Sequence, residues 1–151
     1  MSMAQARSQA RRSAVQALYQ WQMTACDLSE IERQFVEEHG LGGADPAYFK
    51  ELLHEIPTRL DVIDAALSEF VDRPVGEIDL VERAVLRLGA YELLFRPDVP
   101  YRVVLNECIN LAKAFGSIQG HKFVNGALDR VAHKLRPVEV EAFRAKPRAG
   151  K

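Results

Sequence analysis

Apolar side chains recur along most of this chain at intervals of three and four residues, which is the spacing of amphipathic helices. The pattern predicts a first helix over residues 4–25. A second helix is expected from Ser29, whose spacing to Glu32 fits a capping box, to Gly40. Valine and isoleucine follow helical rather than alternating spacing almost everywhere. The pattern therefore favours an all-α fold.

Prolines and glycines divide the rest of the chain into further helices. Asp45 before Pro46 predicts the start of a third helix, because proline suits the first helical position. Pro57 removes a backbone donor, so we expect a kink or a break near Ile56. Three more helices are predicted, over residues 79–95, 104–115 and 122–135.

The 151 residues suit one domain, which we expect to end near Pro137. The segment 138–151 carries several basic residues and is expected to form a flexible tail, partly helical before it frays. The start of the chain, Met1–Gln9, lacks the apolar core of a signal peptide, and no run of 18 apolar residues is present. A cytoplasmic location without a membrane contact follows as an expectation.

The chain has two cysteines, Cys26 and Cys108, and neither has Cys or His neighbours at metal-ligand spacing. We expect both to be reduced, with Cys108 in the core, and we predict no metal site and no cofactor. The histidines are interpreted as ordinary surface or helix-end residues, and no catalytic pattern accompanies them. The sequence therefore predicts a protein that is not an enzyme.

The net charge of −1 conceals a division along the chain. Residues 1–26 carry +3, residues 27–92 carry −10, and residues 93–151 carry +6. Such asymmetry is a clue to binding partners. The basic ends favour nucleic acid, whereas the acidic middle could receive a basic protein.

Two segments could contact phosphates. Arg7 and Arg11 stand four apart and share a face of the first helix, with Arg12 beside them. The second segment is the turn from Lys113 to Lys122, where small and polar residues between two helices could present backbone donors to an anion. An ordinary interhelical turn with solvated lysines remains the alternative, and the turn does not match a nucleotide-binding P-loop.

Several segments of the chain, taken together and in order, resemble the NusB family of transcription antitermination factors. The resemblance runs from about Arg7 to Pro137. The segments that carry it are Ala14–Tyr19 before Trp21, Val81–Arg87, Asp98–Tyr101, Asn106–Glu107, Lys113–Gly116 and His121–Asp129.

The resemblance implies a compact bundle of six to seven helices in two packed halves, about 1–73 and about 77–137, forming one RNA-binding domain. It also implies binding to the boxA element of nascent ribosomal RNA, as a heterodimer with the ribosomal protein NusE and alongside other Nus factors on RNA polymerase. By position, the RNA-side residues would be Arg7, Arg11, Gln16, Lys113, Ser117, Gln119, Lys122 and Phe123, and the basic first helix adds Arg12 to the predicted RNA-binding residues. The NusE-side residues would be Tyr19, Met23, Glu82 and Arg87.

The chain departs from the family pattern where Ser8 and Gln9 interrupt the arginine motif, and where Ile118–Gly120 replaces acidic and serine residues. RNA affinity is left open on both counts, as is homodimer formation by the free protein. Two other functions are also left open: an accessory domain for an RNA methyltransferase, and a helical interaction or oligomerisation protein that binds no RNA.

Overall fold

The computed structural model describes residues 2–145, and the secondary structure of this part of the chain consists of helices joined by turns and loops, with no strand. The all-α prediction is confirmed. Eight α-helices, one π-helical segment and one 3-10 turn are present in the described residues. They are α1 (Met3–Thr24), α2 (Leu28–Arg33), η1 (Gln34–His39), α3 (Pro46–Thr58), α4 (Leu60–Ser68), η2 (Val75–Glu77), α5 (Leu80–Phe95), α6 (Tyr101–Phe115), α7 (Gly120–Leu135) and α8 (Pro137–Ala145).

Polar side chains cap four of these helices, α1, α2, α3 and α5, at their first turn. The Asp45 carboxylate accepts a hydrogen bond from the Tyr48 backbone N–H at 3.2 Å, and Pro46 follows it, as predicted. The expected cap at Ser29 is wrong. Asp27 caps α2 instead, accepting from the Ser29 N–H, because the helix already begins at Leu28. Gly40 ends η1 with a positive φ of 68°, which glycine adopts without steric cost.

Pro57 breaks the long apolar stripe into two helices, as predicted. It lies in the last turn of α3, and Arg59 leaves helical geometry with φ −108° and ψ 23° before α4 begins at Leu60. Ile56 of α3 and Ile63 of α4 are both fully buried, although α3 packs mainly on α1 and α4 mainly on α5. The apolar stripe that Pro57 interrupts is thereby divided between two helices with different neighbours.

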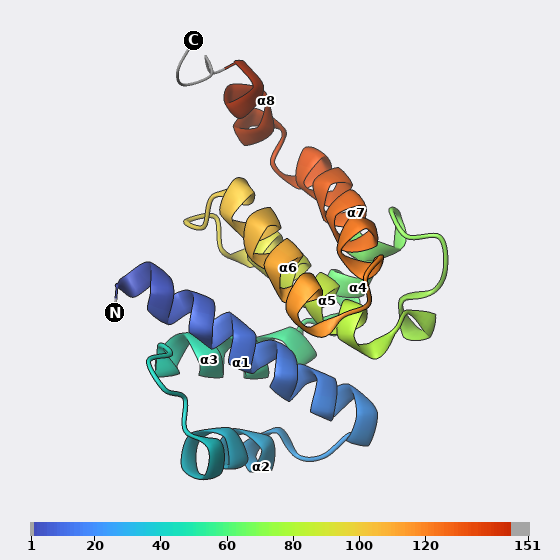
Figure 1. The fold of residues 1–151 in the computed structure, drawn as a ribbon. Helices are drawn as coiled ribbons and strands as arrows, with labels where there is room; N and C mark the ends of the chain where they lie inside the picture. The colour runs from blue at the N-terminus through green and yellow to red at the C-terminus, as the bar shows by residue number, and fades with distance from the viewer. Residues whose placement is uncertain (1, 146–151) are drawn as a thin grey trace.

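The helices form two groups that share α5 as a central element. Figure 1 shows α1, α2 and α3 together at one side, and α4 to α7 at the other. Every residue of α5 from Ala84 to Leu93 is buried, and the helix packs against α1, α3, α4, α6 and α7. At Gly89, an added Cβ would lie 2.6 Å from Leu128 Cδ1 and 3.0 Å from Cys108 Sγ, so glycine permits the close approach of α6 and α7. The expected core position of Cys108 is confirmed.

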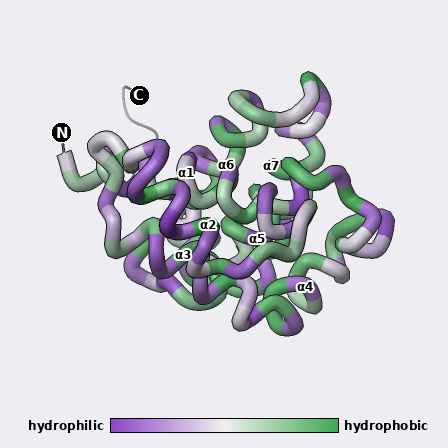
Figure 2. The backbone as a smooth tube through the Cα atoms, turned by 90° about the horizontal axis from the view of Figure 1, so that it is seen from below, coloured by the Kyte–Doolittle hydropathy of each residue, from purple (hydrophilic) through white to green (hydrophobic). Residues whose placement is uncertain are grey.

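Apolar and polar stretches alternate along the tube of each helix in Figure 2, as amphipathic helices around a shared core require. No helix in residues 2–145 combines the length and the apolar character that crossing a membrane requires.

Pro137 does not end the folded chain. It begins α8, which packs against α7, and Val140 of α8 is buried at 2% exposure. The Glu139 carboxylate accepts from the Tyr101 backbone N–H at 2.6 Å and pairs with Arg136 at 3.2 Å. Helix α8 therefore belongs to the packed structure up to Ala145. The remaining residues of the expected tail, 146–151, lie outside the described part of the chain.

Candidate nucleic-acid and partner interface

Helix α1 supplies the three arginines that the sequence singles out, but only one of them is fully exposed. Arg11 is buried at 2% exposure, Arg7 is half-buried, and Arg12 is exposed. The i, i+4 spacing does place Arg7 and Arg11 on one face, and both guanidinium groups lie over the Tyr48 ring, at 4.8 and 5.5 Å. That face packs inward, against α3 and α5.

Arg11 is not the surface cation that its charge and spacing lead us to expect, because its side chain is buried. Its guanidinium donates to both oxygens of Glu92 at 3.0 and 3.1 Å, and to Glu107 at 3.0 Å. Glu92 is completely buried and also accepts from the Tyr48 hydroxyl. Sequence spacing fixes which residues share a face but not which face is covered. Here the face of Arg11 meets carboxylates of α5 and α6, so the side chain joins the two halves of the fold.

The same network sets the electrostatics around α1. Burial raises the pKa of the Tyr48 phenol, with the neighbouring Glu92 carboxylate adding to the shift, so Tyr48 acts as a hydrogen-bond donor. At the edge of the network, a hydrogen bond from Arg96 lowers the pKa of Asp98, which also lies 3.7 Å from Arg7. Arg7 is therefore tethered at the rim of this network rather than free on the surface.

Arg12 is the outward-facing cation of α1. Its guanidinium lies 4.8 Å from the centre of the Phe115 ring, in the last turn of α6. This contact brings the middle of α1 beside the turn that joins α6 to α7 (Figure 1). Arg12 thus lies beside the second basic segment, the turn from Lys113 to Lys122.

The turn between α6 and α7, residues 116–119, presents a polar and basic surface. Lys113, Ser117, Gln119 and Lys122 are all exposed around it. Beneath it, the Glu82 side chain reaches up from α5, with Oε1 3.4 Å from the Ser117 hydroxyl. The turn is thereby positioned by a buried carboxylate.

Glu82 itself is mostly hidden, at 8% exposure. The expectation that it faces a protein partner is not supported by this placement, because its carboxylate lies under the turn. An added Cβ at Gly120 would lie 2.2 Å from Glu82 Oε1, which shows how closely the first residue of α7 covers the carboxylate.

Arg87, the other charged residue assigned to the partner side, is also buried, at 7% exposure. It donates to both oxygens of Asp64, at 3.0 and 2.9 Å, and to the Gln22 side chain at 3.0 Å. These contacts tie α5 to α4 and to the end of α1. Arg87 thus holds helices together, and little of its side chain is accessible to a partner.

An apolar groove of about 600 Å³ lies between α1, η1 and the adjacent ends of α5 and α6. It is bordered by three residues that the sequence assigns to binding: Gln16, Tyr19 and Met23. Met23 is 55% exposed, so its apolar side chain is accessible at the border of the groove. Gln16 is exposed, so the predicted RNA side and the predicted partner side meet at this groove.

Sequence reasoning missed the residues that form the walls and floor of the groove. Val15, Phe35, Val81 and Phe115 come from four separate elements. Each fits its own helical stripe, so the sequence identifies it as apolar without showing that the four converge. The role of Phe115, which also supports Arg12, emerges only from the packing.

Phe123 lies at the far side of the turn and is half-buried. The guanidinium of Arg73 lies 4.7 Å from the centre of its ring. Part of the ring is therefore available to an incoming group, although its inner edge packs on the core. Among residues 2–145, no group of three or more metal-ligating side chains is gathered in one place.

Comparison with known proteins matches both the sequence and the fold. A model of the NusB family matches residues 8–133. The transcription antitermination protein NusB of Nitrosococcus oceani is 52% identical over 137 residues, covering 91% of this chain and 92% of that protein. The structure of T. maritima NusB superimposes with a TM-score of 0.76 at 31% identity, covering 89% of this chain and 96% of that chain.

A further solved structure contains antitermination factors NusB and NusE in complex with dsRNA. The chain there that matches has a TM-score of 0.79 at 28% identity, covering 88% of this chain and 99% of that chain. A family model spanning most of the sequence and relatives of nearly full coverage agree with the fold, and we conclude that the chain belongs to the NusB family.

Proposed function

We propose that this chain is a non-enzymatic transcription antitermination factor that binds boxA RNA as a heterodimer with NusE, a protein of the small ribosomal subunit. The observation that carries the proposal is the meeting of two surfaces in a member of the NusB family: exposed cations around the α6–α7 turn, and an apolar groove beside them. A solved relative that contains NusB, NusE and RNA supports the same pairing.

The RNA-binding part of the proposal rests on Arg12, Gln16, Lys113, Lys122 and the turn between α6 and α7. Single-stranded RNA requires cations for its phosphates, and polar or aromatic groups for its unstacked bases. The exposed lysines and Arg12 supply charge, whereas Gln16 with Ser117, Gln119 and Phe123 supplies hydrogen bonds and a ring. Arg7, at the edge of the buried network, contributes positive charge. Arg11 does not contact RNA in this proposal and instead holds α1 in place through its buried ion pairs.

The NusE part of the proposal rests on the groove. Tyr19 and Met23 provide apolar contacts of the kind found at the centres of protein interfaces. The acidic residues of the middle of the chain would attract a basic ribosomal protein and orient it. Contacts with other Nus factors and RNA polymerase would then be indirect, through the assembled cytoplasmic complex.

Binding of labelled boxA RNA and of a scrambled RNA, with and without NusE and across salt concentrations, tests this function. We expect a preference for boxA that increases when NusE is present. Loss of one phosphate contact in Lys122→Ala should weaken binding and reduce the slope of log K against log salt by about 0.7. Lys50→Ala, at an exposed lysine of α3, is the matched control and should behave like wild type.

Arg12→Ala should likewise weaken boxA binding, whereas Arg33→Ala, at an exposed arginine of α2, should leave it unchanged. Equal affinity of the heterodimer for boxA and for the scrambled RNA would contradict the proposed function.

A further inference from the structure

A second hollowed surface runs along α7, away from the α6–α7 turn. One hollow, of about 210 Å³, is bordered by Phe70, Lys122, Phe123 and Arg130 among others. The adjoining hollow, of about 510 Å³, is bordered by Phe70, Arg130, His133 and Lys134 among others. Because the two share Phe70 and Arg130, they form one continuous surface, which we name the α7 outer surface.

The spacing of its residues follows one face of the helix. Lys122, Gly126, Arg130 and Lys134 succeed one another at intervals of four. At a rise of 1.5 Å per residue, the span from Lys122 to Lys134 is ~18 Å. Gly126 has no side chain, and nothing lies within 4 Å of where a Cβ would stand, so the middle of the surface is open.

The charges along this surface leave an excess of cations. Lys134 pairs with Glu69, and Arg73 pairs with Asp72 at 2.7 Å. Within the described part of the chain, neither Lys122 nor Arg130 has a carboxylate oxygen within 4.0 Å.

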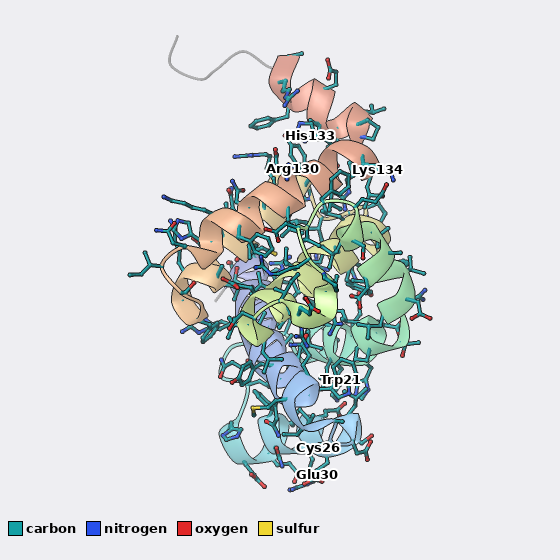
Figure 3. The ribbon with its side chains drawn as sticks, turned by 90° about the vertical axis from the view of Figure 1, so that its right-hand side faces the viewer. Trp21, Cys26, Glu30, Arg130, His133 and Lys134 are labelled. Carbon is teal, nitrogen blue, oxygen red and sulfur yellow. The ribbon has the colours of Figure 1, made fainter. Side chains whose placement is uncertain are left out.

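The far end of the surface carries further basic groups. Figure 3 shows Arg130, His133 and Lys134 gathered on α7 close to α8, at the opposite end of the molecule from Trp21 and Cys26. His133 Nδ1 lies 3.7 Å from an Asp129 carboxylate oxygen, and Arg144 of α8 contacts His133 Nε2 at 2.7 Å. Basic side chains of α7 and α8 therefore meet at this end.

Two phenylalanine rings lie between the cations. Phe70 and Phe123 are half-buried, and each borders the hollow nearest the α6–α7 turn. Rings on which bases can stack, beside cations that track the backbone, are the combination that binds single-stranded nucleic acid. A protein partner recognised at this surface would instead need more exposed apolar area, of the kind that the groove on α1 provides.

We propose that the α7 outer surface binds a second stretch of single-stranded RNA, continuous with the boxA segment held at the α6–α7 turn. The inference rests on the proposed function, because Lys122 and Phe123 belong to both surfaces. RNA leaving the turn at Lys122 passes Phe123 and Phe70, and its phosphates reach Arg130 and Lys134. The chain thereby binds nucleotides that flank boxA through their charge and stacking rather than through their sequence.

The test compares a minimal boxA RNA with RNAs extended on the 5′ side or the 3′ side by unstructured nucleotides, using the heterodimer with NusE. For wild type, we expect one of the two extensions to tighten binding several-fold, with little dependence on the added sequence. In Arg130→Ala/Lys134→Ala, that gain should disappear while the affinity for minimal boxA stays within twofold of wild type. The loss of two phosphate contacts should lower the salt slope for the extended RNA by about 1.4.

A matched control is Lys50→Ala/Arg59→Ala, which removes exposed cations from α3 and the residue after it. It should retain the gain from the extension. Circular dichroism should show unchanged helix content in both double variants.

Three other outcomes overturn the inference. If neither extension tightens binding, the surface does not hold RNA, although the proposed function stands. If the α7 variant weakens NusE association instead, the surface is a protein contact. If no RNA containing boxA is bound at all, the proposed function fails together with this inference.

Discussion

Arg7, Arg11 and Arg12 lie within two turns of one helix, yet their side chains lie in three different environments. Arg11 is enclosed by carboxylates, Arg7 lies at the rim of the same network, and Arg12 faces outward over an aromatic ring. A buried arginine beside a carboxylate contributes to the arrangement of the fold, because removing either partner leaves an uncompensated charge in the interior. Replacing the buried Arg11 is therefore expected to change stability, whereas replacing the neighbouring, exposed Arg12 is expected to change RNA binding.

Substitution of Arg11 should affect stability first. Arg11→Ala leaves the fully buried Glu92 without its cation, and we expect a loss of about 3–5 kcal/mol in the free energy of unfolding. Denaturant unfolding followed by circular dichroism measures the change. Arg12→Ala is the control, with a loss of no more than about 1 kcal/mol. An unchanged unfolding midpoint for Arg11→Ala would mean that the buried pair is not formed.

Helices α5 and α8 show how an element acquires its role from its neighbours. The α5 segment is surrounded by five other helices, so its side chains have no room to change volume. Helix α8 contacts the rest of the fold through the buried Val140, the Glu139 carboxylate, the Phe143 ring and the Arg144 guanidinium. Each helix therefore offers a substitution whose effect depends on packing rather than on helix propensity.

Gly89→Ala should destabilise the protein although alanine favours helices. The added methyl group would lie 2.6 Å from the fully buried Leu128, and overpacking of this kind costs about 1–3 kcal/mol. Thermal unfolding should show a lower midpoint. Gly126→Ala makes the same substitution on α7 where no atom lies within 4 Å, and it should raise stability by up to about 1 kcal/mol. Similar midpoints for the two variants would contradict the close packing of α5.

Val140→Ala tests whether α8 is docked. Removing two buried methyl groups should cost about 1–3 kcal/mol, because Val140 is 2% exposed. Its neighbour Val138 is 81% exposed, so Val138→Ala should leave the free energy of unfolding nearly unchanged. Denaturant titration distinguishes the two. Equal stability of both variants would show that α8 is not held against the core in solution.

At the scale of the whole molecule, the proposed RNA surface at the α6–α7 turn adjoins the proposed NusE groove on α1, but the two differ in chemistry. The α6–α7 turn is polar and basic, whereas the groove on α1 is apolar. Contact between them through Gln16 and Phe115 places RNA and protein partner side by side, so that a bound partner could extend the RNA site. Their chemical difference makes the two functions separable by mutation.

Met23→Lys should weaken NusE association by at least about 2 kcal/mol, since it places a charge at the exposed edge of the apolar groove. Binding of RNA by the chain alone should be unaffected. Isothermal titration with NusE measures the first effect, and RNA titration of the free chain measures the second. Val62→Lys, at another exposed apolar residue on α4, is the control for the change in charge and should bind NusE normally. Unaltered NusE affinity for Met23→Lys would place the interface elsewhere.

The sequence by itself determined the helices, because their causes are local. Periodic apolar residues, the cap at Asp45 and the break at Pro57 act within a few residues of the chain, and each appears where the pattern predicts it. The family was also recognisable, because its motifs are short and ordered. The helix after Pro137 was underestimated, since Val140 gains its stability from distant residues rather than from its own neighbours.

Only the tertiary structure decided which charged residues are available. Arg11, Glu82 and Arg87 carry the charges expected of a binding surface, but each is buried against side chains more than twenty positions away in the chain. The groove on α1 likewise needs four elements to converge. Spacing along one helix determines which side chains point in the same direction. Which of those directions is covered depends on long-range packing, and the face of α1 that carries Arg11 is covered while Arg12 remains exposed.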